Sequence, residues 1–265
     1  MKNICIVTGA SSGMGRDFVL QIDKKEQFDE IWVIARREDR LIALQEEVNA
    51  KIVPLCIDLT DRDKIKEVFK AKIDAEQPNV KVLACIAGWG RFGHFESITL
   101  EENLSMIDTN LTSAIIMIDY TLKYMHENSN ILLLCSASSV QPVPYINMYA
   151  STKAALLSFS RSLNRELKYR KIHVLGVCPL WINTEFFDHA IDKNEKPVVI
   201  KYGKIDSSEG VIKQAIKDLY SKKDVSIYTF HNKFQQLLVK VLPHKLVMSI
   251  WMKKQKLDGS PSIRK

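Results

Sequence analysis

The sequence has no long hydrophobic run, and glycine, proline and cysteine are scarce among its 265 residues. No apolar run approaches the roughly 18–20 residues that a membrane-spanning helix needs. Ten glycines and eight prolines are too few for a collagen-like or low-complexity chain. A strand-like run begins at Asn3 and leaves no room for a signal peptide, so we expect a cytoplasmic protein.

The five cysteines do not have the number or spacing of a disulfide framework. Each lies in or beside a short apolar run, which is typical of a small buried residue on a strand. The six histidines are scattered without the spacing of metal ligands. We therefore expect neither disulfides nor a metal site. The cysteines are Cys5, Cys56, Cys85, Cys135 and Cys178.

The net charge of +7 is concentrated near the C-terminus. From residue 230 onward, eight basic residues stand against one acid, Asp258, so this stretch alone carries +7 and residues 1–229 are neutral. A nucleic-acid-binding surface should not be confined to such an appendage, so we expect no nucleic-acid partner. The basic residues are Lys233, Lys240, Lys245, Lys253, Lys254, Lys256, Arg264 and Lys265.

Short apolar runs alternate with amphipathic stretches as far as residue 229. The apolar runs lack polar alternation, as expected for parallel strands that are covered by helices on both faces. Repeated strand–helix units imply right-handed crossovers and one doubly wound α/β sheet. We predict a catalytic domain over 1–229, with a seven-stranded parallel sheet, and a helical tail over 230–265. The expected strands are 3–8, 31–35, 52–57, 80–86, 130–136, 172–178 and 225–229, and the expected helices lie near 13–26, 38–49, 61–76, 100–127, 150–169 and 208–222.

The first expected strand runs into a glycine-rich turn that ends at Gly15, and a helical stretch follows. Glycines in such a turn let the backbone approach a pyrophosphate at the N-terminus of the helix. A strand–helix connection that binds nothing would also fit the turn alone. Its place after the first strand of a βαβ unit favours dinucleotide binding. The expected ligand-binding residues of the turn are Gly9, Ser11, Ser12, Gly13, Met14 and Gly15.

The spacing TGxxxGxG of this turn resembles that of the short-chain dehydrogenase/reductase family. Tyr149 and Lys153 match the YxxxK motif of that family, and no other tyrosine in the chain has a lysine four residues on. Ser136 lies thirteen residues before Tyr149, where the family has its catalytic serine, and Asn110 matches the family's asparagine between the fourth and fifth strands. The resemblance covers residues 3–229 and implies a Rossmann-like fold with these four residues as the catalytic set.

The resemblance also implies a role for each of the four residues. Tyr149 is the general acid/base that exchanges a proton with the ketone or alcohol oxygen. A free tyrosine has a pKa of about 10, so we expect the Lys153 ammonium and the positive nicotinamide to lower it. Lys153 also holds the nicotinamide ribose, Ser136 donates to the substrate oxygen, and Asn110 holds a water for proton relay.

The second expected strand leads into Arg36 and Arg37, at the place where NAD-binding relatives carry an acid for the ribose hydroxyls. A guanidinium pairs bidentately with a 2′-phosphate, so these residues predict NADP as the cofactor. Two arginines at this place would also suit the solvated start of a helix. The resemblance assigns further cofactor contacts to Asp58, Leu59, Ala87, Gly88, Pro179, Ile182 and Thr184.

Two stretches depart from the family pattern. Cys85 and Ile86 stand where the family usually has two asparagines before the Ala-Gly pair. Leu180 replaces the glycine that usually follows Pro179. The polar support of the missing asparagines must therefore come from elsewhere, and Leu180 should restrict the backbone near the nicotinamide.

Three segments, 89–97, 140–148 and 181–190, are expected on the substrate side, and their apolar and aromatic residues suit a bulky hydrophobic substrate. Some of these residues would equally pack in the core or a subunit interface. We expect a hydroxysteroid as substrate, with a 3-oxoacyl or other lipid ketone as the alternative and a catalytically silent NADP-binding sensor as the alternative from another class. The residues are Trp89, Phe92, Phe95, Val140, Val143, Tyr145, Ile146, Met148, Trp181, Phe186 and Phe187.

The tail has apolar residues at helical spacing on both sides of Pro243, which predicts two short amphipathic helices with basic faces. One interpretation is contact with an anionic membrane surface or an acidic carrier. The other is a lid over the substrate or a contact in the homodimer or homotetramer that we expect. The apolar residues are Phe234, Leu237, Leu238, Val241, Leu242, Leu246, Val247, Ile250 and Trp251.

Overall fold

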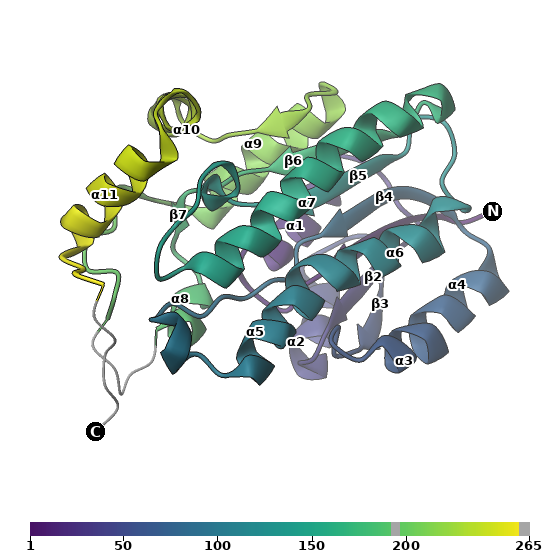
Figure 1. Cartoon of the computed structure of the whole chain (residues 1–265). Coiled ribbons are helices and arrows are strands. Elements are labelled where there is room, and N and C mark those ends of the chain that lie inside the picture. The colour runs from purple at the N-terminus through teal and green to yellow at the C-terminus, as the bar shows by residue number, and fades with distance from the viewer. Residues whose placement is uncertain (192–196, 260–265) are drawn as a thin grey trace.

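A computed structural model describes residues 1–191 and 197–259. Figure 1 shows a central sheet between two layers of helices, with the N-terminus at one end and α10 and α11 at the other. The seven strands are parallel and run in the order β3-β2-β1-β4-β5-β6-β9, which confirms the predicted doubly wound sheet. They are β1 (Asn3–Thr8), β2 (Glu30–Ala35), β3 (Lys51–Cys56), β4 (Asn79–Cys85), β5 (Asn130–Leu134), β6 (His173–Val177) and β9 (Val225–Ser226).

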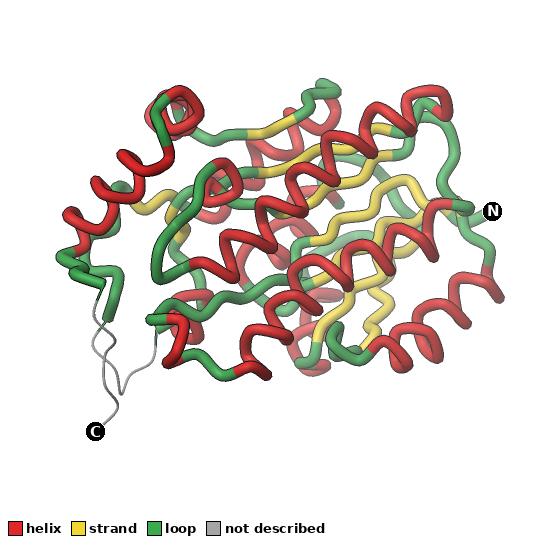
Figure 2. The backbone as a smooth tube through the Cα atoms, viewed as in Figure 1, coloured by secondary structure: helices red, strands yellow, loops and turns green. Residues whose placement is uncertain are grey.

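The helices follow the predicted order along the chain and cover both faces of the sheet (Figure 2). Two expected helices are interrupted by wider π-helical segments, at Ile65–Lys70 and Asp108–Thr112. The helices are α1 (Gly13–Ile22), α2 (Glu38–Ile42), α3 (Arg62–Lys64), α4 (Ala71–Glu76), α5 (Leu100–Ile107), α6 (Ser113–Leu122), α7 (Asn147–Glu166), α8 (Phe186–Ala190), α9 (Ser208–Tyr220), α10 (Phe230–Val241) and α11 (His244–Gln255).

The apolar strands supply a separate core to each face of the sheet, because successive side chains of a strand point to opposite faces. In β1, Ile4 and Ile6 belong to one core, whereas Cys5 and Val7 belong to the other, and all four are fully buried. This explains why the strands show no polar alternation. The expected burial of the cysteines is wrong for Cys56, which is exposed at the end of β3, where its thiol donates to a backbone oxygen.

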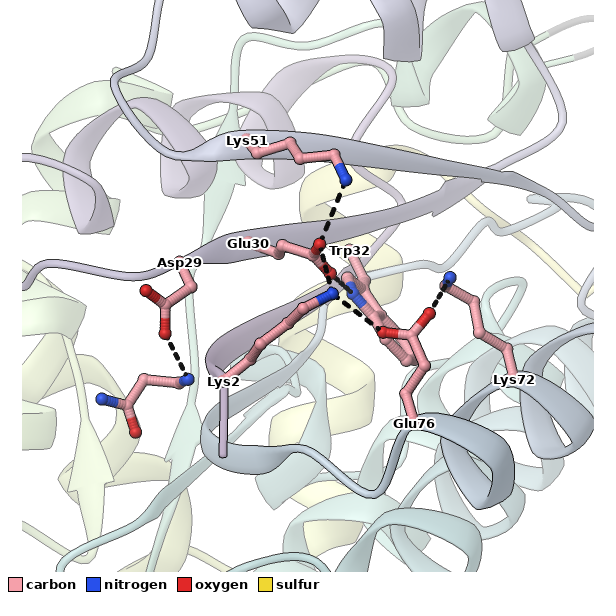
Figure 3. Close-up of polar contacts among 8 residues, drawn as sticks. Lys2, Asp29, Glu30, Trp32, Lys51, Lys72 and Glu76 are labelled. Atoms are coloured by element: carbon pink, nitrogen blue, oxygen red, sulfur yellow. Dashed lines mark hydrogen bonds and ion pairs between the residues drawn. The ribbon is translucent and has the colours of Figure 1, made fainter.

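A charged cluster closes the amino ends of the first three strands (Figure 3). Its centre is the buried carboxylate of Glu30, which accepts hydrogen bonds from Lys2 Nζ at 2.8 Å, Trp32 Nε1 at 3.0 Å and Lys51 Nζ at 3.2 Å. Burial alone would raise the pKa of Glu30, but these donors outweigh it and lower the pKa to about 2. The cluster therefore stabilises β1, β2 and β3 at the end of the sheet that is opposite their carboxyl ends.

Buried polar side chains attach the two tail helices to the rest of the chain. On α10, Asn232 donates to Asp206 at 2.9 Å and Gln236 donates to the carbonyl of Cys178 at 3.2 Å. On α11, the indole of Trp251 donates to the carbonyl of Pro144 at 3.0 Å, and Gln255 pairs with the backbone of residues 200–201. Asp206 belongs to β8 (Ile205–Asp206), which pairs with β7 (Trp181–Ile182) in a small second sheet that the sequence did not predict.

Candidate active site

A cavity of about 1020 Å³ lies at the carboxyl ends of the central strands, where ligands bind in open α/β sheets. It is lined by the glycine-rich turn on one side and by α10 and α11 on the other. Every predicted site residue except Asn110 contributes to its walls. These residues are Gly9, Ser11, Ser12, Gly13, Met14, Gly15, Arg36, Arg37, Asp58, Leu59, Ala87, Gly88, Ser136, Tyr149, Lys153, Pro179, Ile182 and Thr184.

The glycine-rich turn has a shape that side chains would not permit. Gly9 has a φ of +72°, and a Cβ there would lie 2.8 Å from the backbone of Ala87. A Cβ on Gly15 would lie 2.1 Å from the carbonyl oxygen of Gly9. At the start of α1, Ser12 makes no side-chain cap and the first turn contains no acidic residue. The free amide groups and the helix dipole therefore suit a phosphate, so the turn fits the pyrophosphate of a dinucleotide.

The polar support that the two missing asparagines would supply comes in part from Thr8 at the end of β1. Its hydroxyl oxygen accepts hydrogen bonds from the backbone amides of Ile86 at 3.0 Å and Ala87 at 3.1 Å. Cys85 and Ile86 are themselves buried in the apolar core. The chain thus joins the carboxyl ends of β1 and β4 through one hydroxyl and accommodates the departure from the family pattern.

The two arginines after β2 differ in their surroundings. Arg37 donates to the hydroxyls of Ser11 at 3.0 Å and Ser12 at 2.8 Å, directly beside the glycine-rich turn. The side chain of Arg36 is 74% exposed and lies 3.9 Å from Asp58. Both guanidinium groups stand at the cavity wall, and Arg37 is the one held against the turn.

Arg37 also forms an ion pair that the sequence did not indicate. The Glu185 carboxylate accepts from Arg37 at 2.8 Å and from Arg40 at 2.7 Å. Hydrogen bonds from Arg40 and Arg37 lower the pKa of Glu185 to about 2. Glu185 precedes α8, about 150 residues along the chain from the arginines, so no local pattern could have linked them.

Ser136 and Tyr149 are brought together at the floor of the cavity. Ser136 follows β5, and its hydroxyl oxygen accepts from the backbone amide of Ser138 at 3.2 Å. A side-chain hydrogen bond joins Ser136 to the phenol of Tyr149, on the first turn of α7. The two hydroxyls can thus address one substrate oxygen. Ser139 accepts from the Ser136 amide at 3.1 Å and so holds the turn that carries the serine.

The pKa of Tyr149 is raised in the protein alone, whereas the sequence led us to expect a lowered pKa. Burial raises the pKa of Tyr149 to about 12, and the hydrogen bond with Ser136 opposes this only in part. Lys153 is buried too, so its pKa falls to about 8. Its ammonium donates to the carbonyl of Leu134 at 2.7 Å and lies 5.8 Å from the centre of the Tyr149 ring. At neutral pH the site therefore holds a protonated phenol beside a charged lysine.

Asn110 lies beneath the cavity rather than in its wall. Its side-chain oxygen accepts from the Trp89 amide and its nitrogen donates to the Trp89 carbonyl, both at 2.9 Å. The nitrogen also donates to the Thr152 hydroxyl at 3.1 Å. The side chain therefore fixes the segment after β4 against α7, and it reaches this position from a π-helical segment, a feature frequent at functional sites. Its relay role stays a prediction.

The substrate side of the cavity is walled by aromatic rings. Phe92 and Phe186 both pack against the Tyr149 ring, with centroid distances of 6.1 Å and 5.4 Å. Phe95, Tyr145 and Met148, expected in this wall, are not part of it; Phe95 is largely exposed instead. The expected residues that do line the cavity are Trp89, Phe92, Val140, Val143, Ile146, Trp181, Phe186 and Phe187.

Residues of the tail also line the cavity. This agrees with the interpretation of the tail as a lid over the substrate. The cavity is lined by Leu238 and Val239 of α10, by Leu242 directly after that helix, and by Ile250 and Trp251 of α11.

Two of the tail's basic residues, Arg264 and Lys265, lie outside the described residues. Within residues 1–191 and 197–259, no group of three or more His, Cys, Asp or Glu could hold a metal ion, and no helix has the length and hydropathy to cross a bilayer.

The model of the short chain dehydrogenase family matches residues 3–195. An uncharacterized oxidoreductase of Staphylococcus epidermidis is 27% identical over 185 residues, covering 69% of this chain and 79% of the relative. A 3-oxoacyl-acyl-carrier-protein reductase of Thermotoga maritima is 27% identical over 193 residues, 72% of this chain and 78% of the relative. A very-long-chain 3-oxoacyl-CoA reductase of Bos taurus is 26% identical over 235 residues, 86% and 72% of the two chains.

Solved structures share the fold at lower identity. A short-chain dehydrogenase from Sphingobium yanoikuyae in complex with NADPH matches with a TM-score of 0.73 and 22% identity, covering 92% of this chain and 96% of that one. A bulky-bulky ketone specific alcohol dehydrogenase from Comamonas testosteroni matches at 0.70 and 19%, covering 92% and 95%. A short-chain dehydrogenase from Mycobacterium paratuberculosis bound to NAD matches at 0.68 and 19%, covering 85% and 95%.

Proposed function

Because the chain belongs to the short-chain dehydrogenase/reductase family, we propose that it interconverts a ketone and a secondary alcohol on a bulky apolar substrate, with NADP(H) as its cofactor. One observation carries the proposal: a single cavity joins the glycine-rich turn, Arg37, the pair of Ser136 and Tyr149, and an aromatic wall. These are the parts needed to hold a phosphorylated dinucleotide beside an apolar carbonyl compound.

The residues divide the proton chemistry between them, while the nicotinamide would supply or accept the hydride. Tyr149 is protonated at neutral pH, because burial raises its pKa to about 12, and so it can donate a proton to a ketone oxygen during reduction. Ser136 donates a hydrogen bond to the same oxygen and stabilises the charge that develops there. The buried Lys153 ammonium lies beside the phenol ring and stabilises the tyrosinate that remains.

The preference for NADP rests on positive charge beside the glycine-rich turn. Arg37 is held by Ser11 and Ser12, and Arg36 stands next to it at the cavity wall. No acidic residue occupies the place after β2 where a carboxylate would accept from the ribose hydroxyls of NAD. A neighbouring structure in complex with NADPH supports this choice by likeness of fold alone.

The apolar wall supports a hydroxysteroid or a similarly bulky ketone as the substrate. The alternative within the same chemistry is a 3-oxoacyl or other lipid ketone, which is favoured by the names of the relatives from Thermotoga maritima and Bos taurus. A solved neighbour specific for bulky-bulky ketones favours a substrate with two large substituents. We also propose that the active form is a homodimer or homotetramer in the cytoplasm.

The proposal is tested with a panel of steroid ketones and 3-oxoacyl thioesters, following NADPH absorbance in the wild type and in Tyr149→Phe. We expect turnover of at least one panel member by the wild type and none by the variant. Hydride transfer in a single turnover separates an enzyme from the alternative of a catalytically silent NADP-binding sensor. Tight NADPH binding without transfer to any panel member would favour the sensor.

A further inference from the structure

The outer face of α10 carries an apolar stripe that the active site does not use. Phe230, Phe234, Leu237 and Val241 follow one another at helical spacing and form what we term the outer stripe. Their exposed fractions range from 57% for Phe234 to 82% for Phe230. Large apolar side chains gathered on one exposed face mark a surface that binds a partner.

The opposite face of α10 is anchored, so the outer stripe is presented in a fixed orientation. Asn232 and Gln236 are buried there and donate to Asp206 and to the carbonyl of Cys178. Val239, one turn after Gln236, is also buried and lines the cavity. Turning the outer stripe inward would break both hydrogen bonds and leave buried polar groups unpaired. The outer stripe is therefore a stable feature of the surface.

Two positive charges flank this stripe. Lys233 and Lys240 are exposed on α10 itself, spaced seven residues apart along one flank of the outer stripe. Residues 1–229 are neutral, whereas residues 230–265 carry +7. A surface that combines a cationic flank with an apolar stripe matches the boundary between anionic headgroups and acyl chains.

The outer stripe adjoins the mouth of the cavity. Leu238 follows Leu237 on α10, lines the cavity and is still 44% exposed. Ile250 of α11 also lines the cavity and is 53% exposed. These two residues therefore form an apolar rim that connects the interior of the cavity with the outer surface of the tail. Figure 1 shows both helices at the end of the molecule opposite the N-terminus.

We propose that the outer stripe docks on a membrane surface that contains anionic lipid. The four apolar side chains enter the boundary between headgroups and acyl chains, and Lys233 and Lys240 remain among the headgroups. A second copy of the chain fits this face less well. A two-fold contact would bring Lys233 and Lys240 of two copies toward each other, and a stable interface takes roughly 20–30 residues a side.

Docking in this orientation brings the apolar rim at Leu238 and Ile250 to the lipid. An apolar substrate would then pass between the bilayer and the cavity without crossing water, a consequence that rests on the proposed function. The docking itself does not, because the outer stripe lies outside the catalytic machinery. It can therefore be tested without substrate or cofactor.

The test is sedimentation of the full chain with vesicles of phosphatidylcholine alone or mixed with phosphatidylserine. We expect the wild type to bind the mixed vesicles and to leave the neutral ones largely unbound. Phe234→Asp/Leu237→Asp should lower binding at least tenfold. Lys233→Gln/Lys240→Gln should lower it about twenty-fivefold at low salt, at roughly fivefold per lysine near an anionic surface, and should reduce its salt dependence.

The matched control is Tyr169→Asp, compared with Phe234→Asp alone, so that each variant places one negative charge on an exposed aromatic residue; Tyr169 is 83% exposed and lies before the amino end of β6. The Tyr169→Asp variant should bind vesicles like the wild type. Unchanged thermal melting in all variants shows that the fold is retained. Failure of the wild type to bind, or equal binding by the Phe234→Asp/Leu237→Asp variant, overturns the proposal. So does a lower oligomeric state of that variant without lipid, which would assign the outer stripe to a contact between copies.

Discussion

Removing one arginine at a time should separate the two guanidinium groups by their contribution to NADPH binding. A charge-assisted hydrogen bond contributes roughly 1.5–3 kcal/mol, which is about a tenfold to a hundredfold change in affinity. Arg37 is held in place by Ser11 and Ser12 beside the glycine-rich turn, so Arg37→Ala should fall at the upper end. Arg36 is 74% exposed and well solvated, so Arg36→Ala should fall at the lower end.

The assay is a fluorescence titration that gives Kd for NADPH and NADH with the same protein preparations. Both variants should bind NADH almost like the wild type, because NADH lacks the 2′-phosphate. Arg36→Asp should go further and lower the ratio of kcat/KM for NADPH to that for NADH. The matched control is Arg62→Ala, which removes an exposed arginine paired with Asp108 outside the cavity wall. Equal weakening of NADPH and NADH by Arg37→Ala would refute the phosphate assignment.

Three further predictions concern catalysis, stability and the tail. Tyr149→Phe should abolish ketone reduction and keep the NADPH Kd within a few-fold, because the ring remains and only the proton is lost; near-normal turnover would contradict this. Glu30→Gln should lower the free energy of unfolding by up to about 3 kcal/mol at pH 7, at 1.36 kcal/mol per pKa unit. The folded-state pKa of Glu30 is depressed, so this stability is present above pH 4.5 and is lost as the pH falls toward 2. Urea titrations of the wild type and Glu30→Gln would exclude this if the two proteins differed in free energy of unfolding by the same amount above pH 4.5 and near pH 2. Deleting residues 233–265 should leave NADPH affinity within a few-fold and raise the KM for an apolar ketone, and an unchanged KM would show that the tail is not part of the substrate site.

The sheet was predictable because most strands are local runs of apolar residues, and β2, β5 and β6 are buried on both faces. The serine, tyrosine and lysine proposed for catalysis were also accessible from sequence, since their spacing follows from one strand end and one helix turn. The π-helical segment at Asp108–Thr112 could not be predicted from the sequence, because such a segment has no residue signature of its own. It directs Asn110 to the Trp89 backbone, beneath the cavity.

Properties that depend on distant neighbours were beyond the sequence. The pKa of Tyr149 is set by how deeply the phenol is buried, and the YxxxK motif says nothing about burial. The pairing of β7 with β8 joins residues more than twenty positions apart through only two residues of each strand. The tail's apolar spacing predicted two helices, but which residues face the cavity depends on the hydrogen bonds of Asn232 and Gln236 on α10 and of Trp251 and Gln255 on α11.

The carboxylate of Glu185 connects the dinucleotide side of the cavity with its aromatic substrate side. It pairs with Arg37 beside the glycine-rich turn, and it immediately precedes Phe186 in the aromatic wall. An anion that takes Arg37 from Glu185 would leave that carboxylate to Arg40 alone, and by reciprocity a ligand that shifts Glu185 would change the affinity for that anion by the same factor. The affinities for the two ligands are thus coupled through the carboxylate of Glu185.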